Sequence, residues 1–186
     1  LNLMCHLSGV ATATSRWVDA VAGTGAVIRD TRKTTPLLRR LEKYAVRCGG
    51  GQNHRMSLSD AALVKDNHIA AAGGVENAFR LIRDAAGSLP IEIEVDTVDQ
   101  LKVAIAAGAD VVLLDNMPPA VMREAVAVVA AHKASTGRDV LLEASGGLTL
   151  ANAGDVAATG VHYISVGALT HSSPVLDIGL DFETVA

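Results

Sequence analysis

The 186-residue sequence has few aromatic residues, two cysteines and no long apolar run. Because it contains only two Phe, two Tyr and one Trp, its core must be built mainly from Ala, Val, Leu and Ile. Two cysteines are too few for a disulfide framework. The sequence also lacks the charged segment followed by an apolar one that is typical of a signal peptide, so we expect a cytoplasmic protein. No run approaches the roughly 18 apolar residues of a membrane helix, so we expect no membrane partner.

An excess of basic charge is also missing, because 16 basic and 20 acidic residues give a net charge of −4. This balance argues against general nucleic-acid binding and favours a small-molecule ligand. The positive charge is nevertheless concentrated, since nine basic and three acidic residues lie between Arg29 and Lys65. We expect four of these to coat the exposed face of a helix, namely Arg39, Arg40, Lys43 and Arg47. The others lie beside glycines or strand ends.

Length and pattern predict one domain that spans residues 1–186. Residues 1–23 predict an opening helix, which has neither an initiator Met nor a clear N-cap, so we interpret the chain as a piece of a longer protein. Short apolar runs predict strands at 26–30, 62–66, 91–95, 111–115, 140–144 and 162–166. Ala-rich amphipathic segments predict helices at 36–47, 75–86, 98–107, 119–133 and 151–159.

This alternation predicts an α/β fold with parallel strands and crossover helices. A doubly wound open sheet and a (β/α) barrel both fit such units. Nearly every strand ends on a chemically capable residue, as at Asp30, Lys65, Glu94, Asp115 and Glu143. Side chains from many strand ends meet at one mouth in a barrel, whereas an open sheet binds its ligand at one switch point. We therefore predict an incomplete or open TIM-like (β/α) barrel of about six parallel strands, preceded by an N-terminal helix.

The last two predicted strands end in small residues, within the segments EASGG and SVGALTH. Barrels often bind phosphate after their final two strands, where small residues let backbone N–H groups approach the oxygens. We expect a phosphate site formed by Ser145, Gly146, Gly147, Gly167 and His171.

Two earlier segments carry candidate cations. The segment DTRKTTP places Arg32 and Lys33 directly after the first strand. The planar guanidinium of the arginine and the compact ammonium group of the lysine together suit a polyanionic ligand. In CGGGQNHR, the glycines at 49–51 predict a close backbone approach to a ligand. The residues after them include His54 and Arg55 as polar candidates.

Lys65 ends the second strand, and it could serve as a cation for a carboxylate or, if buried, as a Schiff-base nucleophile. Glu94 and Asp115 end the next two strands, and they could hold Mg²⁺ or the hydroxyls of a ribose. Glu92 and Glu94 share one face of a strand, so one of them could instead pair with a structural Lys or Arg.

In order and spacing, the segments LSGVATAT, DTRKTTP, KYAVRCGGGQNHR, LVKDNH, EIEVDT, LLDN, EASGG and VGALTH resemble the C-terminal barrel domain of the quinolinate phosphoribosyltransferase family. The resemblance covers almost the whole chain. Members of this family, the carboxylating nicotinate-nucleotide pyrophosphorylases, transfer a phosphoribosyl group from phosphoribosyl pyrophosphate to quinolinate with loss of CO₂. The products are nicotinate mononucleotide and pyrophosphate, for NAD biosynthesis.

The resemblance implies a role for each group of residues. The quinolinate carboxylates would bind Arg32, His54, Arg55 and Lys65. The phosphoribosyl pyrophosphate would bind Lys33, Glu94, Asp115, Ser145, Gly146, Gly147, Gly167 and His171. Glu94 and Asp115 would hold Mg²⁺, partly through substrate and water, and the catalytic residues would be Lys33, Lys65, Glu94 and Asp115.

The family also carries an N-terminal domain that this sequence lacks, and in a homodimer that domain completes the partner's active site. The resemblance therefore implies a homodimer or higher homo-oligomer, and we expect the 186-residue chain alone to have little activity. Leu37 stands where the family typically has Gly, and Ala144 where Ser is frequent.

Three other interpretations stay open. A ModD-like paralogue of the same fold, associated with molybdenum transport, would use a different substrate. A class I aldolase-type barrel would use Lys65 as its nucleophile, but it gives no reason for the cations of TRK and NHR. A barrel that only binds phosphorylated metabolites gives no reason for paired Glu94 and Asp115.

Overall fold

The computed structural model describes residues 1–183 and contains one six-stranded parallel sheet, with the strands in the order β1-β6-β5-β4-β3-β2. The strands are β1 (Val27–Arg29), β2 (Ala62–Val64), β3 (Ile91–Val95), β4 (Val111–Asp115), β5 (Leu141–Ser145) and β6 (Tyr163–Ser165). Each of the six predicted runs therefore forms a strand. β1 and β2 are the two ends of this order, so the prediction of an open TIM-like barrel is confirmed.

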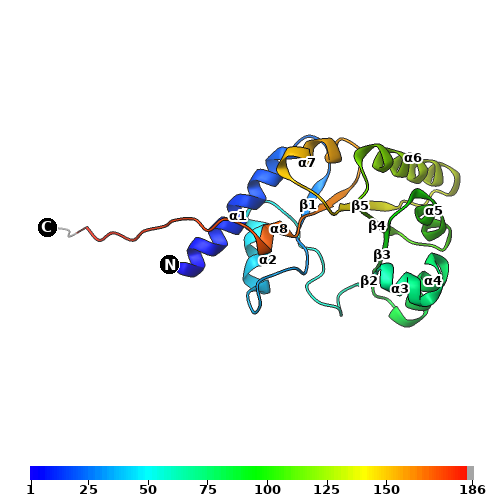
Figure 1. The fold of residues 1–186 in the computed structure, drawn as a ribbon, viewed down its shortest axis with the longest axis horizontal. Coiled ribbons are helices and arrows are strands. Elements are labelled where there is room, and N and C mark those ends of the chain that lie inside the picture. The colour runs from blue at the N-terminus through cyan, green and yellow to red at the C-terminus, as the bar shows by residue number, and fades with distance from the viewer. Residues whose placement is uncertain (184–186) are drawn as a thin grey trace.

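Helices follow the strands and cover the outside of the sheet (Figure 1). They are α1 (Asn2–Ala20), α2 (Arg39–Cys48), α3 (Asp66–Ala72), α4 (Val75–Ala86), α5 (Val98–Ala106), α6 (Pro119–Thr136), α7 (Leu150–Ala157) and α8 (Ala168–His171). The opening helix and the five predicted crossover helices are present. The pattern did not predict α3 and α8, because helices of seven and four residues are too short to show a periodic apolar face.

Alternation along each strand separates the core from the interior of the barrel. The apolar side chains that face the helices are buried, and they include Ile28, Val64, Ile93, Leu114, Leu142 and Ile164. The intervening residues point to the other face, because successive strand side chains alternate. Those residues are largely polar, and several are charged: Arg29, Glu92, Glu94, Asp115 and Glu143. The apolar core therefore lies between sheet and helices, and the barrel interior is left for chemistry.

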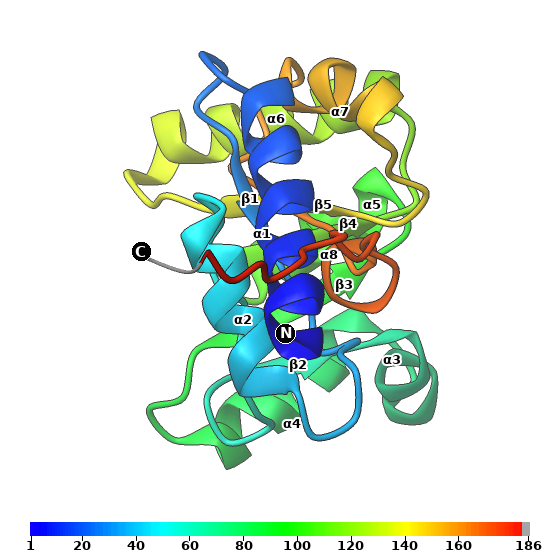
Figure 2. The same cartoon turned by 90° about the vertical axis from the view of Figure 1, so that its left-hand side faces the viewer.

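α1 packs across one side of the barrel, against α2, α7, α8 and β1 (Figure 2). The glycines at 49–51 lie where α1 approaches most closely. A Cβ at Gly49 would overlap the backbone of Ala11, and a Cβ at Gly51 would come within 2.9 Å of the Thr14 side chain. The predicted approach of these glycines to a ligand is wrong, because the close neighbour is the N-terminal helix.

The gap between β1 and β2 is partly filled by the chain that connects α2 to β2. Gln52 forms an isolated parallel bridge with Arg29, and its N–H donates to the Ile28 carbonyl at 2.8 Å. Beyond Gln52 this segment pairs with no strand among the described residues. Residues 53–55 must therefore be held in place by side chains.

Lys43 was predicted to coat a helix surface, and this prediction is wrong. Its side chain is fully buried, and its Nζ forms an ion pair with the equally buried Asp30. Burial lowers the pKa of Lys43, although the hydrogen bond and charge of Asp30 oppose that shift. Arg40 and Arg47 are exposed as predicted. Arg39 is half-buried, and its guanidinium donates to the Arg32 carbonyl at 3.2 Å.

Leu37 has a positive φ of 68° and is fully exposed. This left-handed conformation suits glycine much better than leucine, because leucine carries a Cβ.

Among residues 1–183, the helices are all too short or too polar to cross a bilayer.

Candidate active site

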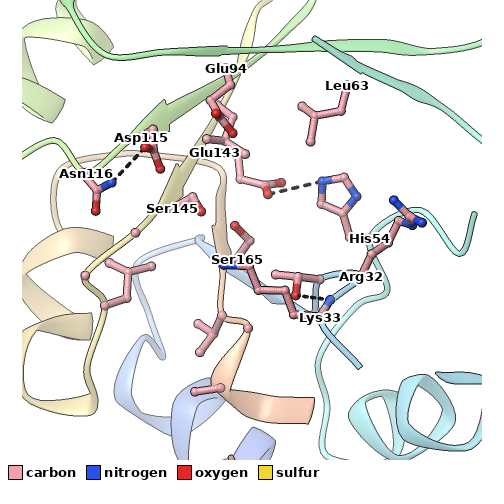
Figure 3. A pocket seen from close by; sticks show the side chains of 18 of the residues that line it. Arg32, Lys33, His54, Leu63, Glu94, Asp115, Asn116, Glu143, Ser145 and Ser165 are labelled. Carbon is pink, nitrogen blue, oxygen red and sulfur yellow. Dashed lines mark hydrogen bonds and ion pairs between the residues drawn. The ribbon is translucent and has the colours of Figure 1, made fainter. Parts of the chain in front are cut away.

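A cavity of about 840 Å³ opens at the carboxyl ends of the strands. Every residue predicted from the sequence to bind substrate lines it: Arg32, Lys33, His54, Arg55, Lys65, Glu94, Asp115, Ser145, Gly146, Gly147, Gly167 and His171. In the view of Figure 3, Asp115 and Ser145 lie on the left, and Arg32, Lys33 and His54 lie on the right. The structure thus brings together residues that are spread over about 140 positions of sequence, as the ends of parallel strands require.

The loop after β1 presents Arg32 and Lys33 to the cavity. Two contacts hold this loop through its own carbonyl groups. Arg39 donates to the Arg32 carbonyl, and the Thr170 hydroxyl donates to the Lys33 carbonyl at 2.7 Å. Because these contacts use the backbone carbonyls, the side chains of Arg32 and Lys33 are not needed to hold the loop, and both line the cavity.

Arg55 lies near Arg32 at the same end of the cavity. Its Nη1 donates to the Ala61 carbonyl at 2.7 Å, and burial together with the charge of Arg32 lowers the pKa of Arg55. The buried Nε of Arg32 has no hydrogen-bond partner among the described residues. Two neighbouring guanidinium groups, one with an unpaired donor, make this end of the cavity a site for a ligand with negative charge.

His54 has both ring nitrogens occupied by protein groups. Nε2 lies 2.9 Å from Oε2 of Glu92 and 3.5 Å from Oε1 of Glu143, and Nδ1 accepts the Arg55 backbone N–H at 2.7 Å. An acceptor at Nδ1 and a carboxylate at Nε2 assign the ring proton to Nε2 whenever the ring is neutral. Desolvation of the ring lowers the pKa of His54, but the hydrogen bond with Glu92 and the charges of both carboxylates outweigh it, so the pKa is raised. Proton uptake would therefore occur above the usual range, and it would break the contact with Arg55.

The backbone of His54 is bonded as fully as its ring. Its N–H donates to Asp30 at 2.8 Å, and its carbonyl accepts from Lys43 Nζ at 2.9 Å. Asn53 Nδ2 also donates to Asp30, at 2.6 Å. The buried pair of Asp30 and Lys43 therefore supports the cationic end of the cavity from outside.

Glu143 lies beneath the cavity and is fully buried. Its Oε2 accepts from Arg29 Nη1 at 2.9 Å, and the Arg29 guanidinium lies 3.3 Å from the ring centre of Tyr163. Desolvation and the negative charge of Glu92 raise the pKa of Glu143. The sequence marked Glu143 as a strand-end acid but assigned it no partner. The sequence does predict that Glu143 points into the barrel, because Glu143 precedes Ser145 by two residues and therefore shares its strand face.

His54, Glu92 and Glu143 are residue types that could hold a metal ion, with one potential ligand atom from each lying within 4.8 Å of the others. The contacts of His54 argue against that use. A ring nitrogen can bind a metal only through a free lone pair, and here the lone pair of Nδ1 accepts the Arg55 N–H while Nε2 carries the proton. The cluster is therefore better described as a hydrogen-bonded support for the cavity.

Glu94 and Lys65, at the ends of the paired strands β3 and β2, form an ion pair with 2.6 Å between Oε2 and Nζ. Asp115 Oδ2 accepts from Asn116 Nδ2 at 2.8 Å. Each of these carboxylates thus uses one oxygen within the protein and has a second oxygen for other partners. Carboxylate oxygens from two adjacent strand ends, completed by substrate and water, fit the preference of Mg²⁺ for hard ligands.

The glycine-rich end of the cavity is formed by backbone after β5 and β6, and its β6 side adjoins the loop that carries Lys33. Gly146 has φ of 87°, and a Cβ there would overlap the side-chain amide of Asn116. After this turn, Thr149 caps α7 in a capping box with Asn152. His171 Nε2 lies beside Gly167, where a Cβ would come within 3.1 Å of it. Small residues therefore line this end of the cavity, where the sequence predicts a phosphate site.

Comparisons with known proteins agree with this arrangement. A family model described as the quinolinate phosphoribosyl transferase C-terminal domain matches residues 10–181. The chain is 58% identical over 181 residues to the carboxylating nicotinate-nucleotide pyrophosphorylase of Mycobacterium leprae, covering 97% of this chain and 62% of that protein. It is 50% identical over 182 residues to a probable enzyme of the same name from Bacillus subtilis, covering 97% and 61%.

A crystal structure of the nicotinate-nucleotide pyrophosphorylase of Ehrlichia chaffeensis superposes with a TM-score of 0.90 at 42% identity. That match covers 98% of this chain and 64% of the other. The chain therefore spans about three fifths of the length of the relatives that it resembles in sequence and fold.

Proposed function

The chain belongs to the quinolinate phosphoribosyl transferase C-terminal domain family, and from that premise we propose that it transfers the phosphoribosyl group of phosphoribosyl pyrophosphate to quinolinate. The transfer is accompanied by decarboxylation and yields nicotinate mononucleotide, pyrophosphate and CO₂. The observation that carries this proposal is the division of one cavity into a cationic end and a glycine-rich end, with two carboxylates between them.

The cationic end suits a planar diacid. Arg32, Arg55 and Lys65 supply three positive charges around one space, and an aromatic dicarboxylate has two carboxylates to bind. His54 lies in the same wall, and its Nε2–H would reach a substrate carboxylate only by leaving Glu92. Lys65 would likewise exchange Glu94 for the substrate when quinolinate binds.

The glycine-rich end suits the 5′-phosphate of the donor. Ser145, Gly146, Gly147 and Gly167 offer backbone N–H groups and a hydroxyl, and His171 lies beside them. Between the two ends, Glu94 and Asp115 would bind ribose hydroxyls and hold Mg²⁺. When bound, Mg²⁺ supplies positive charge to the pyrophosphate oxygens.

The roles of the protein groups in the reaction are electrostatic. Lys33 would stabilise the negative charge that grows on pyrophosphate as its bond to C1 of the ribose breaks. Glu94 and Asp115 would face the ribose while C1 becomes positively charged. By binding the substrate carboxylates, Arg32, Arg55 and Lys65 would hold the pyridine nitrogen in line with C1. After the bond forms, the C2–carboxylate bond breaks and CO₂ leaves, the positively charged ring nitrogen stabilises the electron pair left on C2, and a proton from water then replaces the carboxylate at C2.

The ion pair between Lys65 and Glu94 supports a role for Lys65 as a charge partner. A carboxylate partner at 2.6 Å shows that Lys65 is placed to pair with negatively charged groups, as binding of a substrate carboxylate requires. The contact thus favours the charge-partner role over the aldolase-type interpretation.

We further propose that the active form is a homodimer or higher homo-oligomer in which a partner's N-terminal domain completes the site. In support of this proposal, the relatives are longer than this chain. A reducing cytoplasm is the compartment we propose, because Cys5 and Cys48 both carry free thiols.

The proposal is tested by calorimetric titration of the chain with quinolinate, nicotinate and phosphoribosyl pyrophosphate. Quinolinate should bind more tightly than nicotinate, because nicotinate lacks the second carboxylate, and the pyrophosphate donor should bind more tightly with Mg²⁺. Turnover should then be measured after adding the N-terminal domain of a relative. Equal affinity for the two pyridine acids, or no effect of Mg²⁺ on the donor, would contradict the proposal.

A further inference from the structure

The segment that carries His54 and Arg55 is held in an unusual way. It closes the side of the barrel where β1 and β2 do not pair, so no strand ladder fixes it beyond Gln52. Instead, each polar group of His54 has a separate protein partner. Asp30 and Lys43 bind its backbone, Glu92 binds Nε2, and the Arg55 N–H binds Nδ1.

We propose that Glu92 is a positioning residue for the diacid site, which fixes the His54 ring so that its Nδ1 holds the Arg55 backbone and aims the Arg55 side chain into the cavity. This inference rests on the proposed function, in which Arg55 binds a quinolinate carboxylate.

The argument depends on the direction of each hydrogen bond. Nδ1 accepts the Arg55 N–H at 2.7 Å only while it is unprotonated, and a neutral ring must then carry its proton on Nε2. An N–H on Nε2, largely buried, requires an acceptor, and Glu92 supplies one at 2.9 Å. Removal of the acceptor would favour the other tautomer or a rotated ring, and either change removes the acceptor of the Arg55 N–H.

Glu92 is suited to this role by its own surroundings. It lies on β3, between the paired strands β2 and β4, so its backbone is fixed on both sides. Its side chain is buried beside Glu143, which Arg29 holds in turn. Since Arg55 also donates to the Ala61 carbonyl at 2.7 Å, a fixed backbone and one fixed guanidinium nitrogen together define the direction of its remaining donors.

The role of Glu92 is distinguished from a simple charge effect by two substitutions. In Glu92→Gln the side-chain oxygen can still accept from Nε2–H, so the His54 tautomer should persist. In Glu92→Leu the acceptor at 2.9 Å is lost, and the nearest remaining carboxylate oxygen, Oε1 of Glu143, lies 3.5 Å from Nε2. We expect Glu92→Gln to bind quinolinate within about twofold of the wild type and Glu92→Leu to bind about tenfold more weakly, the usual cost of an unsatisfied buried donor.

A ligand-independent measurement accompanies the titration. Amide exchange of Arg55, followed by NMR, should be slow in the wild type and in Glu92→Gln, and faster in Glu92→Leu because the Nδ1 acceptor is lost. The imidazole ¹⁵N spectrum of the wild-type chain near pH 8 should show His54 protonated on Nε2 alone.

The matched control is His6→Leu, which removes another His–Glu pair of nearly the same length outside the cavity, between His6 and Glu42 at 2.8 Å. It should leave quinolinate affinity and Arg55 exchange unchanged. Circular dichroism and thermal unfolding identify a variant that does not fold, and in that case the ¹⁵N spectrum and the Gln variant decide.

Equal losses in Glu92→Gln and Glu92→Leu would overturn the inference, because the charge rather than the acceptor would then matter. Unchanged Arg55 exchange in a folded Glu92→Leu variant, or an Nδ1-protonated His54 in the wild type, would also overturn it. A wild-type chain that shows the expected tautomer and exchange but binds no quinolinate would instead contradict the proposed function.

Discussion

The two ends of the cavity are held in place by different means. At the glycine-rich end, the turns after β5 and β6 continue strands that are paired on both sides, and a capped helix follows the first of them. At the cationic end, residues 53–55 lie in the gap of the barrel and depend on buried charged side chains. The backbone of the sheet thus positions one end, and ion pairs position the other.

This difference predicts where each end is vulnerable. Turns that continue a strand ladder are sensitive to added side-chain atoms, because their backbone is the binding surface. A segment held by buried charges is sensitive to the loss of one charged partner, because the other partner is then left unpaired in a medium of low dielectric constant. Four measurements test the contrast.

The largest effect is expected for Lys43→Met. The substitution keeps an unbranched chain of similar length but leaves Asp30 as a buried carboxylate without its cation. We expect the free energy of unfolding to fall by about 3–5 kcal/mol. Urea denaturation measures the change. The double variant Lys43→Met with Asp30→Leu should recover part of it, and a single-variant loss below about 1 kcal/mol would contradict the importance of this pair.

A smaller loss is expected for Gly146→Ala at the other end. The left-handed φ of 87° costs alanine roughly 1–2 kcal/mol, and the new methyl group also overlaps Asn116. The matched control is Gly23→Ala, since Gly23 has φ of 78° but no atom within 4 Å of an added Cβ. Urea denaturation should show a larger loss at Gly146 than at Gly23, and phosphate affinity should fall only for Gly146→Ala. Equal losses would mean that the overlap has no effect.

The pH dependence of stability should have opposite signs at two histidines. Burial lowers the pKa of His162, with a smaller opposing effect of Asp139, so the unfolded chain binds this proton more readily. The stability that His162 contributes is present above about pH 6.5 and is lost as the pH falls below it. The pKa of His54 is raised, so its contribution is present below about pH 6.5 and is lost as the pH rises through the raised value.

Urea denaturation between about pH 5 and 8.5 should separate these contributions. His162→Asn, which keeps an acceptor for the Leu142 N–H, should reduce the loss on the acid side. His54→Gln should reduce the loss on the alkaline side. A His162→Asn variant with the acid-side slope of the wild type would show that the ring does not titrate differently in the folded state.

The smallest effect is expected for Leu37→Gly, in the loop that carries Lys33. Relief of roughly 1–2 kcal/mol of left-handed strain is offset by about 0.5–1 kcal/mol of extra freedom in the unfolded chain, which leaves a gain of about 0.5 kcal/mol. Thermal unfolding measures the change. A decrease in stability would show that the exposed leucine makes a favourable contact in solution.

Much of the cavity was predictable from strand ends. Each predicted strand is present, and parallel strands in one sheet have their carboxyl ends on the same side, so residues such as Arg32, Lys65 and Glu94 had to face one mouth. The glycines after β5 and β6 were predictable for the same reason. The short helices α3 and α8 were not, because they lack a periodic pattern.

Three features were predicted wrongly or left without a partner. Lys43 belongs to the hydrophilic pattern of α2, yet its face of the helix meets Asp30 inside the protein. The glycines at 49–51 meet α1 rather than a ligand. Glu92 was predicted only to share a strand face with Glu94, so that one of the two could pair with a Lys or Arg, whereas its partner is His54. In each case the deciding neighbour is distant in sequence or lies on another element.

The amino-acid sequence by itself determined the order of strands and helices. It also determined that the candidate site residues lie together at the carboxyl ends of the strands, and which charged and polar groups are available there. Periodicity and strand direction are local properties, so they can be read along the chain. Only the tertiary structure decided which buried charges pair, which nitrogen of His54 carries its proton, and what the close-packed glycines touch. The first two outcomes depend on contacts among residues 30, 43, 54, 92 and 143, which become neighbours only after the sheet curves into an open barrel. The third depends on the packing of α1 against the glycines.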